Sequence, residues 1–473
     1  MTAVAADGVG FRSTRGPVLL ALMVSTGLVA IDSTILATAV PSVVADLGGF
    51  AQFPWLFSIY LLTQAVAVPI YAKLADTVGR KPIILLGVAL FLVGSVLCGV
   101  AWSMPALIAF RALQGLGAGA IQPMAITIAG DIYTVAERAK VQGYIASVWA
   151  ISSVVGPTLG GIFSEFVSWR WIFFVNVPLC LLAGWLLLRR FHESVERSSH
   201  RIDYAGSALL AVGVSALILG LLEGDQAWAW ISVPGIAAFV VALLALVAFV
   251  LVERRAPEPV LPLAVFSRPL ITTTTLISLG IGAMLLGLTS YVPTYLEGAL
   301  GVSPLLSGLA LASLTIGWPI SASQSGRLYL RFGFKPTVLL GVAIAVAGTL
   351  LLAATASTPS PLVVAVACFV TGLGFGLAAS PSLIAAQSSV GWEERGVITG
   401  TNLFARSVGS AVGVAVFGAL ANSVFAASAS ASSDRDPAAV TSASTVVFVA
   451  VACCSVITIA ASLAMPAVRP SED

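Results

Sequence analysis

Long apolar stretches separated by short polar segments make up most of the chain. A helix needs about 20 mostly apolar residues to cross the hydrocarbon core of a bilayer. Cutting the sequence wherever charges, Pro-Gly clusters or polar runs interrupt such stretches predicts fourteen membrane-spanning helices. Their expected ranges are 18–40, 52–72, 82–102, 106–130, 141–164, 172–188, 205–222, 230–252, 270–293, 305–326, 337–356, 361–388, 397–421 and 444–466.

Composition supports a membrane protein and excludes several other classes. Only 9% of the 473 residues are charged and 58% are hydrophobic, whereas soluble domains carry roughly 25% charged residues. The net charge of +2 provides no basic surface, so we expect the lipid bilayer as partner and no nucleic acid. The cysteines lie inside apolar runs without metal-ligand spacing, so we interpret them as packing residues and expect no metal site.

The distribution of basic residues predicts the orientation of the chain. If the N-terminus is inside, nearly all of the 23 Lys and Arg residues fall in inside segments, Arg395 and Arg406 among them. The outer loops keep Arg170 and Arg435, and Arg111 falls within a span. We therefore expect a multi-pass protein of the cell (inner or plasma) membrane with both termini cytoplasmic. The small, polar outer loop 423–443 is expected to be a flexible connection.

An internal repeat divides the spans into two sets. Ala72-Lys73-Leu74 with Gly79, Lys81 and Pro82 returns 254 residues later as Gly326-Arg327-Leu328 with Gly333, Lys335 and Pro336. The glycines of 115–119 recur at 372–376, displaced by 257. A parallel repeat of this kind is typical of transporters with a binding site at the bilayer midplane. We expect a six-helix bundle over 1–190, a linker with two inserted helices over 191–268, and a second six-helix bundle over 269–473.

Four motifs carry a resemblance to a known family. They are Ile31–Pro41, Ala72–Lys81, Arg111–Ala118 and Gly156–Gly161. Together they resemble the major facilitator superfamily, and within it the fourteen-span drug:proton antiporters. The resemblance implies an all-α polytopic membrane protein with the major facilitator fold, in which two inserted helices separate two six-helix bundles. It also implies that Arg111 acts in proton coupling and that Gly156, Pro157, Gly160 and Gly161 form an exporter-type antiporter motif.

Asp32 is the only acidic residue that falls within a predicted span. A charge at such depth costs several kcal/mol unless it is paired, hydrated or protonated. Asp32 lies about eight residues from the outer end of its predicted helix and Arg111 about five from that of another, so the two side chains can meet. Burial favours a protonated carboxylate and a nearby arginine favours an ionised one, so we interpret the pair as the proton-coupling site. The alternative is a static ion pair that holds two helices together.

The remaining candidates have both structural and functional interpretations. One group of candidates is Asp76, Gly79, Arg80 and Lys81. They form either a cytoplasmic turn whose positive charges orient the protein in the membrane or, as the family resemblance implies, a conformational latch. In the latch, Asp76 caps or pairs with a neighbouring helix end. The glycines of 156–161 allow a kink and close packing, which ordinary helix packing explains nearly as well; Gly409 and Gly413 look like their counterpart. Candidate substrate-cavity residues are Trp55, Tyr60, Gln64, Gln122, Met124, Trp149, Tyr291, Trp318, Asn402 and Phe404.

These observations favour transport over catalysis. His192 and His200 lie in one loop away from any buried nucleophile, and no lysine sits in a phosphate-binding glycine-rich motif, so we expect neither an intramembrane enzyme nor an ATP-driven pump. The leading hypothesis is a monomeric proton-coupled exporter of small amphipathic compounds, which needs no cofactor because the proton gradient supplies the energy. A dedicated exporter of one endogenous metabolite or lipid is the alternative, and the sequence does not separate the two.

Overall fold

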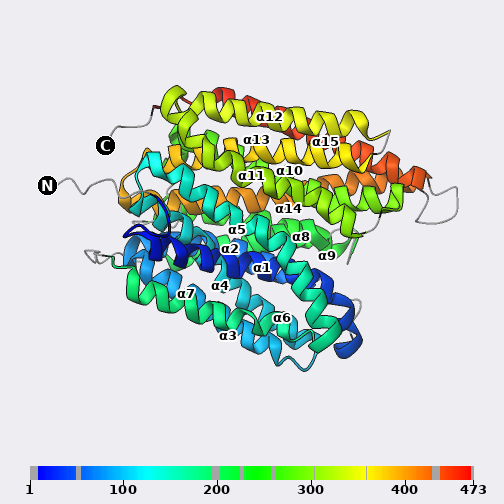
Figure 1. Ribbon diagram of the computed structural model, residues 1–473, viewed down its shortest axis with the longest axis horizontal. Helices are drawn as coiled ribbons and strands as arrows, with labels where there is room; N and C mark the ends of the chain where they lie inside the picture. The colour runs from blue at the N-terminus through cyan, green and yellow to red at the C-terminus, as the bar shows by residue number, and fades with distance from the viewer. Residues whose placement is uncertain are drawn as a thin grey trace. The chain divides into compact units, whose positions relative to one another are not determined.

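Long apolar helices account for almost all of the ordered chain. The computed structural model describes residues 9–48, 55–193, 203–223, 228–229, 231–256, 263–302, 304–357, 360–428 and 437–469. Within these ranges, 13 helices are long and apolar enough to cross a membrane, and a shorter apolar helix lies at Ala205–Leu221. The chain is therefore a multi-pass all-α membrane protein, as its hydropathy pattern predicts (Figure 1).

Helix packing divides the chain into two compact units. Unit 1 comprises 1–215, 245–262 and 390–400, and unit 2 comprises 216–244, 263–389 and 401–473. The first turn of α14 therefore packs with unit 1, while the rest of that helix packs with unit 2. The domain limits expected from the sequence, at 190 and 268, stay a prediction.

The helices follow the predicted spans with longer ends. The first half contains α1 (Gly16–Leu47), α2 (Trp55–Val78), α3 (Arg80–Gly99), α4 (Met104–Ile132), α5 (Val135–Ile162), the π-turn η2 (Phe163–Val167), α6 (Trp171–Phe174) and α7 (Asn176–Arg190). The two inserted helices are α8 (Tyr204–Glu223) and α9 (Val233–Glu253). The second half contains η3 (Leu263–Ser267), α10 (Pro269–Leu300), α11 (Pro304–Phe332), α12 (Phe334–Thr355), α13 (Pro361–Ser388), η4 (Trp392–Glu394), α14 (Arg395–Ser428) and α15 (Pro437–Ala464).

One predicted span contains a local interruption, and one expected loop needs correction. The span predicted over 172–188 is confirmed as Trp171–Arg190; the single residue Val175 separates α6 from α7 there, because Pro178 has no N–H with which to bond the carbonyl of Phe174. The loop predicted over 423–443 is shorter, because α14 runs to Ser428 and α15 begins at Pro437. The small polar residues between these helices, and most of the charged segment 189–203, lie outside the described residues.

The two halves repeat the same helix contacts at equivalent positions. A Cβ on Gly117 of α4 would meet the backbone of Gly87 and Phe91 on α3. In the second half, a Cβ on Gly374 of α13 would meet the backbone of Gly341 and Ala345 on α12. Gly341 and Ala345 follow Gly87 and Phe91 by 254 residues, the same displacement as between the two copies of the loop motif. Glycine at these positions lets neighbouring helices approach closely, as in other membrane bundles.

Each half also turns its second helix into its third at an equivalent glycine. Gly79 precedes α3 with φ 102°, and Gly333 precedes α12 with φ 90°. Residues with a Cβ rarely adopt this backbone conformation, so a turn of this shape requires glycine. The repeat read from the sequence therefore corresponds to a shared helix–turn–helix geometry in both halves.

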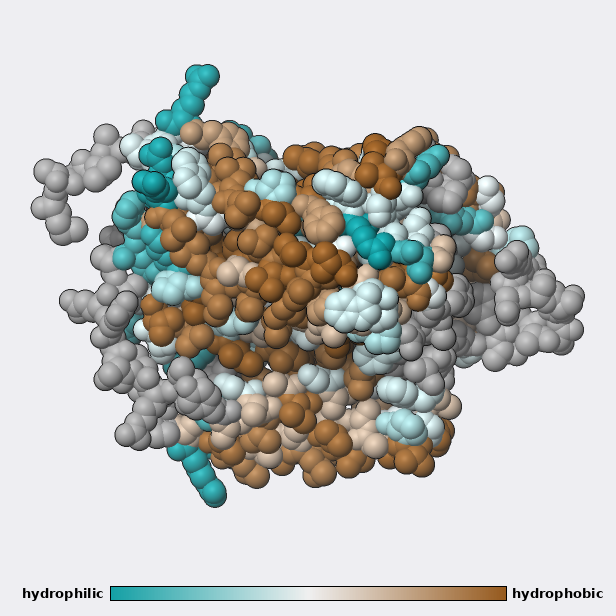
Figure 2. All heavy atoms as spheres, turned by 90° about the horizontal axis from the view of Figure 1, so that it is seen from below, coloured by the Kyte–Doolittle hydropathy of each residue, from teal (hydrophilic) through white to brown (hydrophobic). Residues whose placement is uncertain are grey.

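Apolar side chains cover most of the visible surface along the helices (Figure 2). Leu243 and Leu244 of α9 are 63% and 64% exposed, and Ile457 of α15 is 70% exposed. In water such a surface would be an aggregation hazard, but lipid chains solvate it without cost. The side chains of the two polar clusters described below lie instead inside the helix packing, where they bond to specific partners.

Candidate functional site

Asp32 and Arg111 form a buried ion pair inside unit 1. Arg111 Nη1 of α4 lies 2.6 Å from Asp32 Oδ2 of α1, and each side chain is 1% exposed. Because α1 continues to Leu47, Asp32 lies near the middle of its helix. It lies 15 residues from the C-terminal end of α1, whereas the outer end of the predicted span is eight residues away. At about 1.5 Å per residue, the nearer helix end is more than 20 Å away.

Three neutral side chains complete the hydrogen bonds of this pair. Gln114 Nε2 donates to Asp32 Oδ1 at 2.7 Å, and Asn176 Nδ2 of α7 donates to the same oxygen at 3.2 Å. Gln114 Oε1 accepts from Arg111 Nη1 at 2.7 Å, while its Nε2 also reaches Ser95 Oγ of α3 at 2.8 Å. Side chains of three helices therefore meet at the carboxylate, and Ser95 joins a fourth helix to it through Gln114 and Asn176. We call Asp32, Arg111, Gln114, Asn176 and Ser95 the carboxylate network.

The arginine of the network is held from its other side as well. Its guanidinium carbon lies 4.2 Å from the centroid of the Tyr60 ring, and Arg111 Nε donates to the carbonyl of Leu56 at 3.1 Å. A cation over an aromatic face gains about 0.5–2 kcal/mol, depending on desolvation. Gly94 of α3 permits this arrangement, because a Cβ there would lie 2.8 Å from the backbone nitrogen of Gln114.

Sequence reasoning found two members of the network and missed three. Arg111 and Gln114 are three residues apart and share one helix face, so the quoted motif already contained a signal for Gln114. Asn176 lies at the helix break before Pro178, where an Asn-x-Pro segment was a detectable signal. Ser95 gave none, because a serine in an apolar span most often bonds to its own helix.

The equivalent place in unit 2 holds no charge. The residues displaced by 257 from Arg111 and Gln114 are Cys368 and Thr371, both buried. Thr349, displaced by 254 from Ser95, shares a 3.0 Å hydrogen bond with Ser455 of α15. The two halves thus share packing but not this polar chemistry.

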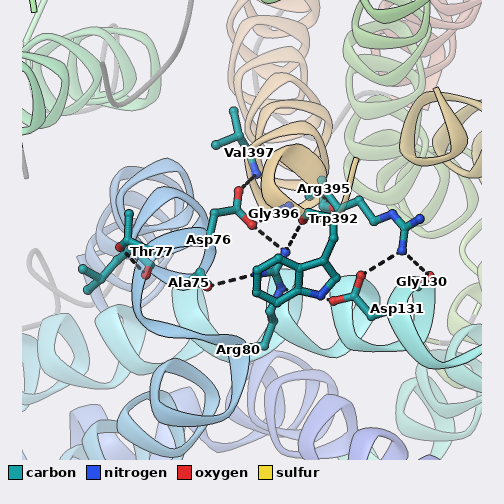
Figure 3. Close-up of polar contacts among 12 residues, drawn as sticks. Ala75, Asp76, Thr77, Arg80, Gly130, Asp131, Trp392, Arg395, Gly396 and Val397 are labelled. Atoms are coloured by element: carbon teal, nitrogen blue, oxygen red, sulfur yellow. Dashed lines mark hydrogen bonds and ion pairs between the residues drawn. The ribbon is translucent and has the colours of Figure 1, made fainter. Parts of the chain in front are cut away.

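A second cluster joins the turn between α2 and α3 to the start of α14 (Figure 3). Asp76 accepts hydrogen bonds from the backbone N–H of Gly396 at 3.0 Å and of Val397 at 2.8 Å. Arg80 Nη2 lies 2.7 Å from Asp76 Oδ1 and donates to the carbonyl of Trp392 at 2.6 Å. A carboxylate at a helix N-terminus satisfies orphan N–H groups and complements the helix dipole. We call Asp76, Arg80 and the partners of both the turn cluster.

Asp131 extends the turn cluster to the end of α4. Its carboxylate lies 3.1 Å from Arg80 Nε and 3.2 Å from Arg395 Nη1. The guanidinium carbon of Arg80 also lies 3.6 Å from the centroid of the Trp392 ring, and no part of the Arg80 side chain is exposed. Sequence reasoning missed Asp131, Trp392 and Arg395, because Asp131 lies on another helix and the other two lie more than 300 residues from Arg80, so none of them leaves a local pattern.

Lys81 does not join the turn cluster. Its Nζ donates to the carbonyls of Leu188 and Phe191 at the end of α7, at 3.1 and 2.5 Å. Glu193, just beyond α7, accepts from the backbone N–H of Arg80 at 2.9 Å and of Lys81 at 2.8 Å. The start of α3 and the end of α7 therefore cap each other, which assigns Lys81 to a different contact from the one expected.

The glycines of the antiporter motif do not act alike. A Cβ on Gly156 of α5 would meet the side chain of Thr34 on α1, whereas a Cβ on Gly161 would meet nothing within 4 Å. The α-helix assignment continues through this segment and changes to a π-turn at Phe163, so the kink stays a prediction. Gly160 is buried, and the side chain of Pro157 lies outside the described residues. Gly156 is thus the motif glycine that lets α5 pack closely on α1, and its counterpart Gly413 lets α14 pack closely on Ala283 of α10.

The candidate cavity residues separate into two groups. Tyr60, Met124 and Asn402 are at most 3% exposed, so they present almost no accessible surface in this conformation, and their place in a cavity stays a prediction. Tyr60 packs on Arg111, Met124 belongs to the apolar core of unit 1, and Asn402 accepts a hydrogen bond from Ser278. The half-buried candidates are Trp55, Gln64, Gln122, Trp149, Tyr291, Trp318 and Phe404. Of these, Gln64 donates to Gln122 at 3.1 Å and Trp318 packs on Phe375.

Comparison with known proteins decides the family. The chain matches the sequence profile of the Major Facilitator Superfamily over residues 22–414. It belongs to that superfamily. It is 35% identical to the multidrug transporter protein MdtP of Bacillus subtilis over 413 residues, which cover 87% of this chain and 76% of that protein. It is 36% identical to multidrug resistance protein 3 of the same organism, over 86% of this chain and 80% of that protein.

Solved structures of facilitators share the fold. The human organic anion transporter MFSD10 aligns with a TM-score of 0.68 at 14% identity, covering 94% of this chain and 99% of that one. The proton:xylose symporter XylE aligns with a TM-score of 0.66 at 13% identity, covering 96% of each chain. Facilitators are transporters rather than enzymes, and this facilitator is related by sequence to multidrug efflux proteins.

One basic residue of this facilitator lies where the sequence analysis did not put it. Arg406 was assigned to an inside segment, but it lies near the middle of the membrane-spanning stretch Trp392–Ala421. The assignment failed because orientation was judged by basic residues near span ends, although predicted span 397–421 already included this position. Three described charged groups, Asp32, Arg111 and Arg406, therefore lie well inside the spans.

Proposed function

We propose that this facilitator is a proton-coupled exporter of small amphipathic compounds, of the multidrug efflux type, which works by alternating access. The observation that carries the proposal is the carboxylate network, in which one deeply buried carboxylate is bound to one arginine. Intramembrane ionisable residues mark ion pathways and proton relays by default. We place both termini on the cytoplasmic side, because that orientation leaves almost all loop Lys and Arg residues inside.

Protonation of Asp32 would change the packing of α1 against α4. The ionised carboxylate accepts from Arg111, Gln114 and Asn176, so its charge is fully compensated. A proton on Asp32 would leave Arg111 as an uncompensated buried charge. Removing one partner of a buried pair costs about 3–5 kcal/mol, which shifts an equilibrium between two conformations by a factor on the order of 10²–10⁴. Proton binding at this site is therefore strong enough to drive a conformational step.

The turn cluster supplies a second element that differs between conformations. Asp76 caps the first turn of α14, and the remainder of that helix packs with unit 2. A movement of α14 away from α2 would break both caps and the contacts of Arg80 with Trp392. We propose that the turn cluster is a latch that stabilises one conformation of the transport cycle. The element with two states is then the start of α14, whose N–H groups are either bonded to Asp76 or free of it.

Replacing Asp32 with Asn tests the proposed function. Reconstituted Asp32→Asn should lose transport driven by a pH gradient, because the amide does not titrate, while exchange of substrate without a gradient remains. Asp46→Asn is the matched control, since Asp46 lies on the same helix and pairs with Arg170 at 2.5 Å with 48% of its side chain exposed. Undiminished gradient-driven transport by Asp32→Asn would overturn the coupling assignment.

A susceptibility panel tests the breadth of transport. The chain should be overexpressed in an efflux-deficient host and exposed to cationic dyes, quinolones and detergents. Raised tolerance to several unrelated compounds supports multidrug efflux. A null result across the panel would favour the dedicated exporter of one metabolite or lipid.

A further inference from the structure

Arg406 of α14 is a charged side chain in the middle of a span with no partner among the described residues. No hydrogen bond or ion pair from its guanidinium to any residue in the described part of the chain is present. It lies about 14 residues from either end of the membrane-spanning stretch Trp392–Ala421. At about 1.5 Å per residue this is roughly 20 Å from each end, which is too far for the side chain to reach the interface.

The surroundings of Arg406 show that it does not face lipid. Every residue of α14 from Gly396 to Ala415 is buried or half-buried, and the first exposed residue after them is Val416. The backbone of Arg406 packs directly on Gly282 of α10, and Ser410, one turn later, donates to the Gly282 carbonyl at 3.0 Å. The Arg406 side chain is thus enclosed by protein, yet it stays half-buried rather than fully buried. Part of its surface remains open to a small molecule.

The described side chains of unit 2 offer almost no acidic group that could neutralise this arginine. Its only acidic residue with a described side chain is Glu297, close to the C-terminal end of α10, where it accepts a hydrogen bond from Ser307 at 2.5 Å. The arginines of unit 1 differ, because Arg15, Arg80 and Arg111 each pair with a carboxylate. An intramembrane charge without a counter-ion is costly and is retained where it serves a function.

We propose that Arg406 binds the anionic group of a transported amphipathic compound. The guanidinium presents planar, paired N–H donors that match a carboxylate, sulfonate or phosphate in a bidentate manner. An enclosed positive charge also repels cations, so the site selects acidic or zwitterionic substrates over lipophilic cations. This assignment of substrate class rests on the proposed export function. It adds a recognition residue in unit 2 to the coupling residues in unit 1.

Two xanthene dyes of similar shape and opposite charge test the proposal. Fluorescein carries a carboxylate and rhodamine 6G is a cation. Binding of each dye to the purified protein in detergent, measured by fluorescence anisotropy, should be compared with gradient-driven uptake into proteoliposomes. Arg406→Gln should weaken fluorescein binding by about tenfold or more, the size expected for loss of a charge-assisted hydrogen bond, and leave rhodamine 6G binding unchanged. Arg406→Lys should recover part of the fluorescein affinity.

Controls separate recognition from folding. Arg331→Gln removes the same charge from an exposed position of α11 in unit 2 and should affect neither dye. Fluorescein should raise the thermal unfolding temperature of the wild type but not that of Arg406→Gln, because only a bound ligand stabilises the folded state. The size-exclusion profile of each variant checks that it is folded.

The outcomes distinguish this inference from the proposed function. Equal loss of both dyes in Arg406→Gln, or fluorescein binding that does not depend on residue 406, would overturn the anion site. Rhodamine 6G transport that requires Asp32, together with no fluorescein binding by the wild type, would leave the export proposal standing and refute the role of Arg406. Fluorescein binding that depends on Arg406 without any gradient-driven transport would support the site and count against proton-coupled export.

Discussion

Gly396→Ala is expected to open the turn cluster without removing any charge. Gly396 lies at the start of α14, where its backbone N–H donates to Asp76. A Cβ at this position would contact Asp76 Oδ1, lie 2.7 Å from the carboxylate carbon and lie 2.8 Å from the carbonyl oxygen of Ala72. The backbone carbonyl cannot move aside, so the carboxylate or the helix end must shift.

The size of the effect follows from the bonds that are lost. Displacement of Asp76 breaks its bonds from the N–H groups of Gly396 and Val397. Hydrogen bonds to charged groups contribute about 1.5–3 kcal/mol each, so the capped conformation should lose about 3–6 kcal/mol relative to the open one. Because 1.4 kcal/mol is a factor of ten, the ratio of the capped to the open conformation should fall by at least about a hundredfold.

Hydrogen exchange measures this loss directly. Peptides that cover residues 394–402 should lose protection in Gly396→Ala, because the amides of residues 396 and 397 no longer have a carboxylate acceptor. Gly308→Ala is the matched control, since Gly308 lies in α11 and a Cβ there would meet nothing within 4 Å. Unchanged protection at residues 396 and 397, with folding intact, would refute the assignment of Asp76 as the cap of α14.

Two further substitutions test residues that sequence reasoning missed. Asn176→Asp would place a second carboxylate beside Asp32, because the Asn176 amide now donates to Asp32 at 3.2 Å. Two carboxylates in one site bind a proton more tightly than one, because their negative charges repel. The pH midpoint of coupled transport should then rise by about one unit or more, and an unchanged profile would show that Asn176 does not contact the coupling carboxylate. Glu193→Gln should lower the thermal unfolding temperature, because it weakens the N-terminal cap of α3, a feature that contributes about 0.5–2 kcal/mol. Glu165→Gln, at an exposed position, should leave that temperature unchanged, and an equal effect of both substitutions would contradict the cap.

Hydropathy predicted the helices because the bilayer sets their minimum length, but it did not predict their ends. The predicted first span stops at residue 40, whereas α1 continues to Leu47. Asp46, near that end, pairs with Arg170, so the last turns of the helix have polar partners that a hydropathy threshold excludes. Apolarity therefore reports the hydrocarbon core, while helices extend beyond it wherever caps and ion pairs satisfy their ends.

The candidate site was predictable in part, for a related reason. A charge within a span stands out against apolar neighbours, so Asp32 and Arg111 could be selected from the sequence. Their neutral partners could not, because Ser95 looks like any other serine in a span. The partners of Arg80 lie on α4 and at the start of α14, and only the folded chain brings them together. Arg406 shows the opposite error, since a rule for loop charges was applied to a residue inside a helix.

The distribution of charge between the repeats indicates how the two halves divide the work of transport. At positions equivalent to Asp76 and Arg80, the second half has Leu330 and Phe334, and Phe334 stacks on Tyr329 at 4.8 Å between ring centroids. At the position equivalent to Arg111 it has Cys368. Packing positions are thus kept in both halves, while among the described residues the ion pairs between side chains occur in unit 1.

This asymmetry has a physical consequence for coupling. A proton bound in one half changes the stability of that half alone, because an intramembrane charge acts most strongly on the helices that contact it. A substrate anion bound at Arg406 would act on the other half through α10 and α14, which pack together at Gly282. Neither ligand then needs to displace the other from a shared site. Because α14 begins in the turn cluster of unit 1 and continues through unit 2, the proposed latch would give both ligands one helix on which to act, which reciprocal coupling between two sites requires.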